Sequence, residues 1–231
     1  MVPALLLAAA AYPAWLSLDL PKGAAFLVIV SCLLYFLASI ARSRGKNLEP
    51  LLIAKWGGWP STVILRRSDT TLDPYTKERY YAELERLGQD IRLPTVDEEN
   101  QSPLEADTLY RSATKRLIEA RRGVQYKILH AENASYGFRR NMLGLKPIAV
   151  TIAISSAAIA IVVWLLKAHA TKLTFAVLVA MVSTDWQMPL LSALDLAYAV
   201  VLLVVVREPF VLQAAREYAG ALLNTLDEPQ T

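Results

Sequence analysis

Two long uncharged stretches stand out in the pattern of hydrophobic and polar positions along the chain. Residues 23–41 are uncharged and end at Arg42, and residues 147–166 are uncharged between Lys146 and Lys167. A helix needs about 20 mostly apolar residues to cross the roughly 30 Å hydrocarbon core of a bilayer. The pattern therefore predicts a membrane-spanning helix in each stretch.

Three further stretches decide how often the chain crosses the membrane. Residues 188–206 are apolar except for Asp195, and we expect a third span there. Residues 1–18 are uncharged and lack the basic start of a signal peptide, so we interpret them as a retained span in a hairpin with residues 23–41. Residues 169–187 are expected to be re-entrant or short. Four spans are predicted, and five is the alternative.

The segment between the two apolar blocks, residues 43–146, is polar and carries signals of helix ends. Asp73 followed by Pro74 is typical of an N-cap with proline at the first helical position. Ser102 and Glu105 have the spacing of a capping box, so we expect a helix to begin there. No strand pattern of convincing length is present. The predicted fold is all-α: a multi-pass transmembrane helix bundle with a cytoplasmic helical insert.

Three further expectations concern the structure and packing of this insert. The acidic run at residues 97–100 is interpreted as an exposed linker, because blocks of like charge are usually solvated. Residues 124–136 are predicted to form a helical stretch that leads toward the next span. The apolar faces of these helices look too small for a separate core. We therefore expect the insert to pack against the membrane helices or against other copies of the chain.

The charges divide the chain into four predicted domains. Of 24 Lys and Arg, residues 42–146 hold 19, together with 14 of the 21 Asp and Glu. Basic residues near span ends mark the cytoplasmic side of a membrane, which places residues 43–146 in the cytoplasm. The domains are an N-terminal transmembrane hairpin (1–42), a cytoplasmic insert (43–146), a C-terminal transmembrane hairpin (147–208) and an amphipathic helix with a tail (209–231). The last should lie on the membrane or pack on the insert.

Composition excludes several classes of function. One cysteine, Cys32, cannot form an intrachain disulfide, and two histidines without a second thiol do not make a conventional zinc site. The sequence has no phosphate-binding loop and no nucleophile elbow. A net charge of +3 is too small to indicate binding of duplex nucleic acid. We predict neither an enzyme nor a cofactor, and we expect the lipid bilayer as a partner.

Asp195 is the most informative charge in the apolar blocks. A carboxylate inside a span is costly and normally faces a bundle interior or water. On a helix Ser192 and Leu196 share its face, and Thr184 and Asp185 lie just before that helix at a predicted mouth. Repeated around a symmetry axis, the two aspartates would form acidic rings, as in cation-selective pores. The alternative places Asp185 in a hairpin turn and Asp195 in a hydrogen bond within the bundle.

Two segments rich in aromatic residues and glycine flank the insert. They contain Trp56, Gly57, Gly58 and Trp59 on one side, and Arg139 and Arg140 on the other. Tryptophans and basic side chains of this kind suit the lipid headgroup layer, which gives the interpretation as an interfacial belt. The alternative interpretation is a hinge through which the insert gates the spans.

The insert and its flanks, residues 50–150, also carry recognisable motifs. These are Trp56-Gly57-Gly58-Trp59-Pro60-Ser61-Thr62, Leu65-Arg66-Arg67-Ser68-Asp69, Thr76-Lys77-Glu78-Arg79-Tyr80 and the stretch 132–147. Together they resemble a family of uncharacterised bacterial inner-membrane proteins. Such proteins are similar to membrane effectors of antiphage defence loci, including the channel component of Hailong-type and the membrane component of Kiwa-type systems. The resemblance implies a homo-oligomeric complex, such as a tetramer, whose activation compromises the membrane; it carries over no active-site residue.

Two functions remain open at this point. The first is a homo-oligomeric ion channel of the inner membrane that is gated by the insert and acts in antiphage defence. A nucleotide, an oligonucleotide or a cytoplasmic regulatory protein would then meet basic surfaces of the insert, although a solvated helix face explains the same residues. These residues are Arg66, Arg67, Arg121 and Arg122. The second is a non-conducting scaffold or sensor that recruits a cytoplasmic partner protein through the insert.

Overall fold

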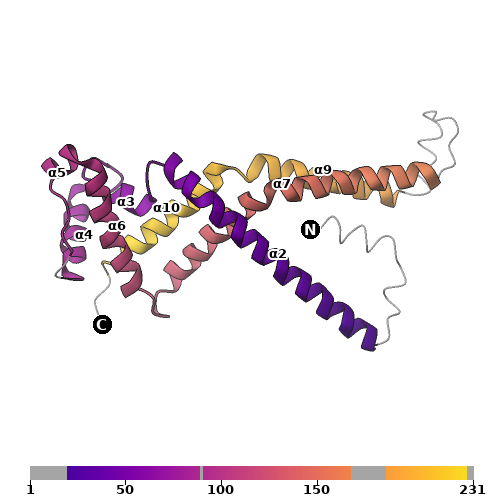
Figure 1. Cartoon of the computed structure of the whole chain (residues 1–231), viewed down its shortest axis with the longest axis horizontal. Coiled ribbons are helices and arrows are strands. Elements are labelled where there is room, and N and C mark those ends of the chain that lie inside the picture. The colour runs from indigo at the N-terminus through magenta and orange to yellow at the C-terminus, as the bar shows by residue number, and fades with distance from the viewer. Residues whose placement is uncertain (1–19, 89–90, 168–185, 228–231) are drawn as a thin grey trace. The chain divides into compact units, whose positions relative to one another are not determined.

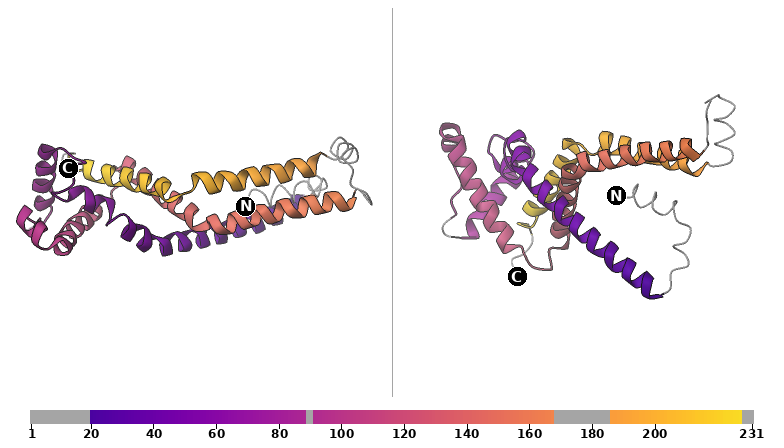
Figure 2. Two further views of the ribbon diagram at one scale, coloured as in Figure 1. Left: turned by 90° about the horizontal axis from the view of Figure 1, so that it is seen from above. Right: turned by 45° about the vertical axis from the view of Figure 1, so that its right-hand side comes forward.

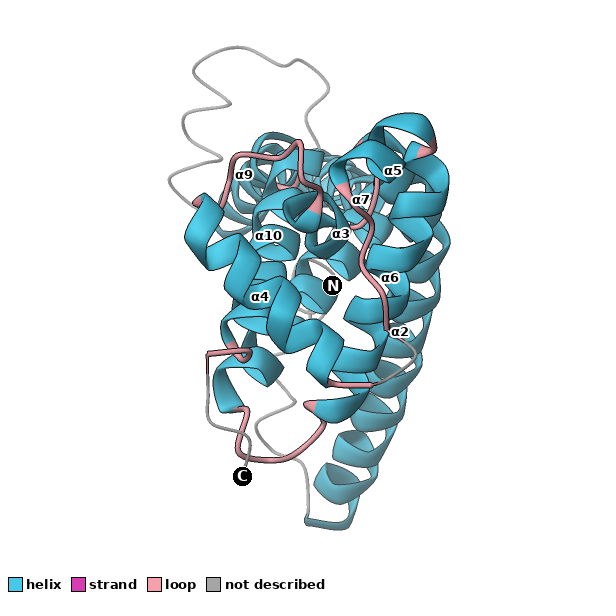
Figure 3. Cartoon of the chain, turned by 90° about the vertical axis from the view of Figure 1, so that its left-hand side faces the viewer, coloured by secondary structure: helices cyan, strands magenta, loops and turns pink. Residues whose placement is uncertain are grey.

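Helices account for every regular element in the part of the chain that the computed structural model describes, residues 20–88, 91–167 and 186–227 (Figure 1; Figure 3). The elements are α2 (Leu20–Lys55), α3 (Pro60–Leu65), α4 (Pro74–Arg86), α5 (Val96–Gln101), α6 (Pro103–Ala120), α7 (Lys127–Lys167), α9 (Gln187–Val205) and α10 (Glu208–Asn224). The prediction of an all-α fold is confirmed over these residues.

Three of these helices, α2, α7 and α9, are long and apolar enough to cross a membrane. Helix α9 covers the span predicted at residues 188–206, and large apolar side chains on all three helices are exposed, as expected for surfaces that face lipid. The chain is accordingly a membrane protein with transmembrane helices. The span predicted at residues 1–18 lies outside the described residues, and so does nearly all of the segment 169–187.

The chain forms two compact units, each built from two stretches of sequence. The first, here called the apolar unit, comprises Met1–Arg44 and Met142–Arg207. The second, here called the polar unit, comprises Gly45–Asn141 and Glu208–Thr231. Helices α2 and α7 each contribute residues to both units without a break in the helix.

Helix α7 joins two segments that are predicted from the sequence as separate helices. The helical stretch predicted at residues 124–136 and the span predicted at residues 147–166 are parts of this one helix. Pro147 lies inside the helix, where the missing backbone donor costs a hydrogen bond and favours a kink. The Thr151 hydroxyl donates a hydrogen bond of 2.9 Å to the carbonyl of Pro147.

In the apolar unit, α7 and α9 lie side by side and run antiparallel (Figure 1; Figure 2). At one end the Lys146 ammonium donates to the carbonyl of Val206 at 2.9 Å, and at the other Met188 packs against Ala160. The contact face of α7 carries small buried side chains, including Ala157 and Ala160. Small residues let two helix backbones approach closely in a membrane, and we call this contact the α7/α9 seam.

The polar unit has a hydrophobic core, which the insert forms together with helix α10 and not by itself. Most of the core residues come from α3, α4, α6 and α10, with Leu93 from the segment before α5 and Leu129 from the start of α7. They include Leu65, Tyr81, Leu84, Tyr110, Leu117, Leu222 and Leu223. Helix α10 supplies the apolar face that the insert lacks, so its packing on the insert, one of its two expected positions, is observed.

The helix ends differ in part from the predictions. Asp73 caps α4 as predicted, since its carboxylate accepts a hydrogen bond of 2.9 Å from the amide of Thr76. Ser102 makes no side-chain capping bond, so the capping box predicted there is wrong. A capping box forms instead at Thr95 and Glu98, which have the same spacing, and it begins α5.

Candidate functional site

Asp195 and Ser192 lie on the buried face of α9, in the α7/α9 seam. Asp195 is 2% exposed, and its Oδ2 atom has no hydrogen-bond partner among the described residues. The Ser192 hydroxyl donates to the carbonyls of Met188, at 3.0 Å, and Ala157, at 3.2 Å. Leu196 is exposed and does not share this face. Thr184 and Asp185, the other two predicted pore residues, lie outside the described residues.

Arg66 and Arg67, predicted to meet a ligand, are engaged inside the polar unit. The Arg66 guanidinium donates to both carboxylate oxygens of Asp107, at 2.8 and 2.6 Å, and to the Gly57 carbonyl. The hydrogen bond to Asp107 raises the pKa of Arg66. Arg67 pairs with Glu78 at 3.0 Å and lies 4.5 Å from the centre of the Tyr81 ring. These two side chains have structural partners that a ligand would have to replace.

Arg121 and Arg122 point to different environments. Arg121 is 7% exposed, donates to the carbonyl of Thr225 at 3.4 Å and lies over the Tyr126 ring. Arg122 is exposed and makes no ion pair with any residue that the structure describes. The four arginines therefore do not act as one free basic surface.

Glu99 is the opposite case, a charge expected in an exposed linker that is buried instead. It lies on α5 at 7% exposure, and its carboxylate accepts hydrogen bonds from the amides of Arg67 and Ser68, at 2.8 and 3.0 Å. The Tyr110 hydroxyl donates to it at 2.7 Å. Burial raises the pKa of Glu99, but these hydrogen bonds outweigh it and lower the pKa below the ordinary value. The interpretation of residues 97–100 as a solvated linker is therefore wrong for Glu99, and all four residues lie in helix α5, although Asp97 and Asn100 are exposed as expected.

The glycine pair predicted as a hinge forms a tight turn between α2 and α3. Helix α2 ends at Lys55, and Gly57 and Gly58 have φ angles of 75° and 139°, which favour glycine. Trp59 precedes Pro60, the first residue of α3. The glycine pair therefore separates α2 from α3.

The other predicted hinge residues tie α2, α7 and α10 together within the polar unit. Lys55 and Trp56 at the end of α2 both bind Glu208, the first residue of α10, with the indole donating at 3.2 Å. Arg139 on α7 donates to the carbonyl of Phe210 at 3.2 Å and lies 3.7 Å from the carboxylate of Glu217. Both contacts end on α10.

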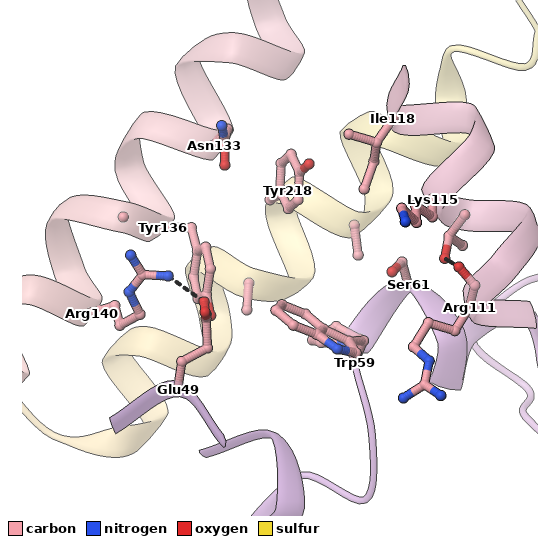
Figure 4. A pocket seen from close by; sticks show the side chains of 15 residues that line it. Glu49, Trp59, Ser61, Arg111, Lys115, Ile118, Asn133, Tyr136, Arg140 and Tyr218 are labelled. Carbon is pink, nitrogen blue, oxygen red and sulfur yellow. Dashed lines mark hydrogen bonds and ion pairs between the residues drawn. The ribbon is translucent and has the colours of Figure 1, made fainter. Parts of the chain in front are cut away.

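A third set of contacts joins α7 directly to α2. The Tyr136 hydroxyl donates to Glu49 at 2.9 Å, and the Arg140 guanidinium forms an ion pair with the same carboxylate (Figure 4). Together with the contacts to α10, this makes a cluster that we call the helix junction. Its members are Glu49, Lys55, Trp56, Tyr136, Arg139, Arg140, Glu208, Phe210 and Glu217. Sequence reasoning found Trp56, Arg139 and Arg140 but missed the carboxylates, because Glu49, Glu208 and Glu217 stand in no motif.

The helix junction is the best candidate functional site in the described residues. It joins the three helices of the polar unit that continue, or directly follow, an apolar helix of the chain. No group of three or more His, Cys, Asp or Glu that could hold a metal occurs among the described residues. The contacts of the junction are ion pairs and hydrogen bonds at partly buried positions, so they can break and re-form without unfolding the core.

Comparisons of the chain with protein-family models, with curated proteins and with solved structures gave no match. The family resemblance of residues 50–150 thus remains an expectation from the sequence.

Proposed function

We propose that this protein is a multi-span protein of the bacterial inner membrane whose polar unit lies in the cytoplasm and controls the membrane-spanning helices. The observation that carries the proposal is the continuity of α2 and α7, which each pass from the apolar unit into the polar unit as one helix. A continuous helix transmits a displacement or rotation of one end to the other, and helix shifts of this kind are a common device of switches.

The helix junction would be the point at which such a movement is controlled. Its contacts link α2 to α7 through Glu49, and both helices to α10 through Glu208 and Glu217. A ligand or partner protein that binds the polar unit can shift its equilibrium only through contacts that differ between two arrangements. Partly exposed ion pairs meet this condition, since each is worth only a small free energy and several change together.

Charge near the span ends supports the cytoplasmic position of the polar unit. Arg42, Arg44 and Lys46 follow the apolar stretch of α2, and Lys146 precedes that of α7. The positive-inside rule assigns such ends to the cytoplasm. In this proposal residues 1–18 add a fourth span and residues 169–187 form a re-entrant or short segment between α7 and α9.

Membrane potential in cells tests this control. The full chain and a Glu49→Gln variant are expressed at matched levels, and depolarisation is followed with a potential-sensitive dye. Glu49→Gln weakens the links to Tyr136 and Arg140, so we expect it to change the rate of depolarisation. The matched control Glu105→Gln alters an exposed glutamate of α6 and should leave the rate unchanged. If the native chain depolarises the cells, equal rates in both variants and the native chain would overturn control of the spans by the helix junction.

A second candidate function is conduction, and Asp195 is the observation that favours it. A buried carboxylate oxygen without a partner in one chain is costly unless a proton, a cation or another copy of the chain satisfies it. Because Asp195 faces α7 within the chain, conduction through a homo-oligomer such as a tetramer would require α7 and α9 to separate and expose this carboxylate to the pore. The antiphage role implied by the resemblance would then follow from loss of the ion gradients.

Ion flux into liposomes that contain the purified chain distinguishes conduction from a scaffold or sensor without a pore. Asp195→Asn should lower cation flux strongly, while Asp195→Glu should retain most of it, because the carboxylate is kept. Flux that is absent under all conditions, or equal in the native chain and Asp195→Asn, would leave the non-conducting sensor as the function. Resistance of the expressing cells to a panel of phages tests the physiological role separately.

A further inference from the structure

A cavity of about 380 Å³ lies within the polar unit, beside the helix junction (Figure 4). Glu49, Tyr136 and Arg140 lie at one end of it, and Arg111 and Lys115 on α6 lie at the other. The volume is in the usual range for small-molecule sites, which are mostly apolar with a few polar groups that fix orientation. The cavity therefore has the size and the construction of a ligand site.

The charges of the lining make one end of the cavity attractive to an anion. The lining holds three cationic residues, Arg111, Lys115 and Arg140, and a single carboxylate, that of Glu49. Arg140 is paired with Glu49, whereas Arg111 and Lys115 form no ion pair with any residue in the described ranges. These two are four residues apart on α6, so their side chains share one face of the helix. Arginine and lysine placed together bind phosphate or carboxylate through charge-assisted hydrogen bonds.

The middle of the cavity is aromatic and apolar. Trp59 and Tyr218 lie between the two ends, with Ile118 on the same side as Tyr218 (Figure 4). Aromatic faces favour planar rings in offset stacks or edge-to-face contacts, and stacking on them tolerates different ring systems. The Ser61 hydroxyl and the Asn133 amide also line the cavity and supply polar groups that can orient a ring.

We propose that this cavity binds a small anion that carries a planar aromatic ring. The anionic group would lie on Arg111 and Lys115, and the ring against Trp59 and Tyr218. A nucleoside monophosphate is a common cellular molecule of this chemistry. Binding stands by itself; only its consequence for the spans, through Glu49 and Arg140, rests on the proposed function.

Isothermal titration calorimetry on the full chain in a neutral detergent tests the proposal. The probes are AMP, adenosine, which has the ring without the charge, and inorganic phosphate, which has the charge without the ring. We expect AMP to bind at least tenfold more tightly than either part. The double variant Arg111→Gln/Lys115→Gln should weaken AMP binding at least about tenfold, since two charge-assisted contacts are lost. Arg116→Gln, an exposed arginine of α6 outside the cavity, is the matched control and should not change it.

A second variant separates the aromatic contact from the charge. Trp59→Leu should weaken AMP binding and leave the weaker binding of phosphate unchanged, and thermal unfolding in the same detergent checks that each variant is folded. The proposal is overturned if AMP does not bind, if the double variant keeps the native affinity, or if phosphate binds as tightly as AMP. Displacement of AMP by phosphatidylglycerol at lower concentration than by any soluble anion would also overturn it, with a lipid as the occupant.

Discussion

Gly45 on α2 lies so close to Asn141 on α7 that a Cβ atom on Gly45 would stand 2.9 Å from the Asn141 Cα. Both residues belong to the polar unit and lie at its boundary with the apolar unit: Gly45 follows the last apolar-unit residue of α2, and Asn141 precedes the first apolar-unit residue of α7. Carbon atoms at van der Waals contact are about 3.5–4.0 Å apart, so any side chain on Gly45 must push the helices apart. The two helices proposed to control the spans are thus packed without spare room at this point.

A Gly45→Ala substitution should therefore destabilise the protein. We expect overpacking to cost about 1–3 kcal/mol, more than the gain of roughly 1 kcal/mol that alanine brings to a helix. Gly220→Ala on α10 is the matched control, because a Cβ there meets nothing within 4 Å, and it should be neutral or stabilising. Thermal unfolding in detergent measures both. Equal melting temperatures for the two variants would contradict the close contact.

We expect the free energy of unfolding to depend on pH, because the carboxylate of Glu99 is buried and ionised. Its pKa in the folded chain lies below the ordinary value of 4.5, so the ionised form stabilises the fold above that pH. This stabilisation is lost as the pH falls through the lowered pKa. Glu99→Gln should cost about 1–3 kcal/mol near pH 7, because the amide cannot satisfy two backbone donors and a hydroxyl equally well.

Denaturant unfolding at a series of pH values measures this effect. The stability difference between the native chain and Glu99→Gln should shrink as the pH is lowered below 4.5. Glu105→Gln, at an exposed position on α6, provides the comparison and should stay within about 0.5 kcal/mol of the native chain. A difference for Glu99→Gln that is constant from neutral to acid pH would refute the role given to the carboxylate.

Arg66 should contribute to the stability of the fold through its pair with Asp107, and not merely add a positive charge to the surface. Its two hydrogen bonds to Asp107 join α6 to the end of α3. Loss of one partner leaves a partly buried carboxylate without its pair, so Arg66→Gln should lower the free energy of unfolding by about 1–3 kcal/mol. Arg122→Gln removes the same charge from an exposed position and is expected to have little effect. Denaturant unfolding of both variants measures this difference in stability. Similar free energies of unfolding for the two variants would contradict a structural role for Arg66 and favour a role in ligand binding.

The α7/α9 seam should tolerate no large side chain. Ala157 is 2% exposed and its carbonyl accepts the hydrogen bond from Ser192, whereas the adjacent Ala158 is exposed. Ala157→Leu should lower the melting temperature of the protein in detergent, because overpacking costs about 1–3 kcal/mol. Ala158→Leu places the same side chain on the outer face and should leave it nearly unchanged. The reverse order would show that a different face of α7 contacts α9.

The apolar helices could be predicted well from the sequence because their signal is local. Nineteen or twenty uncharged residues in a row need a membrane or a large core whatever the rest of the chain does. The N-cap at Asp73 could be predicted equally well, since the side chain and the backbone amide that it binds are three residues apart. The burial of Glu99 could not be predicted, because an acidic run is usually exposed. The backbone amides that bind its carboxylate belong to Arg67 and Ser68, which are more than 30 positions away in the chain.

The helix junction shows the same limit for the candidate site. Arg139 and Arg140 were found because they stand beside a span, but Glu49 lies 91 positions away from Arg140 in the chain. Nothing in the sequence pairs these residues until the fold brings α2 and α7 together. The core of the polar unit depended in the same way on α10, which follows the last apolar helix and yet packs on α3.

The polar unit is proposed to lie in the cytoplasm, and cysteine labelling in intact cells tests this position. Cys32, the one cysteine of the chain, lies exposed on the apolar part of α2 and can be replaced by serine. Ser112→Cys then places a single thiol at an exposed position of α6. We predict that a membrane-impermeant maleimide labels Ser112→Cys only after the inner membrane is opened. Labelling of this thiol from outside, in cells or spheroplasts with an intact inner membrane, would show that the polar unit does not lie in the cytoplasm.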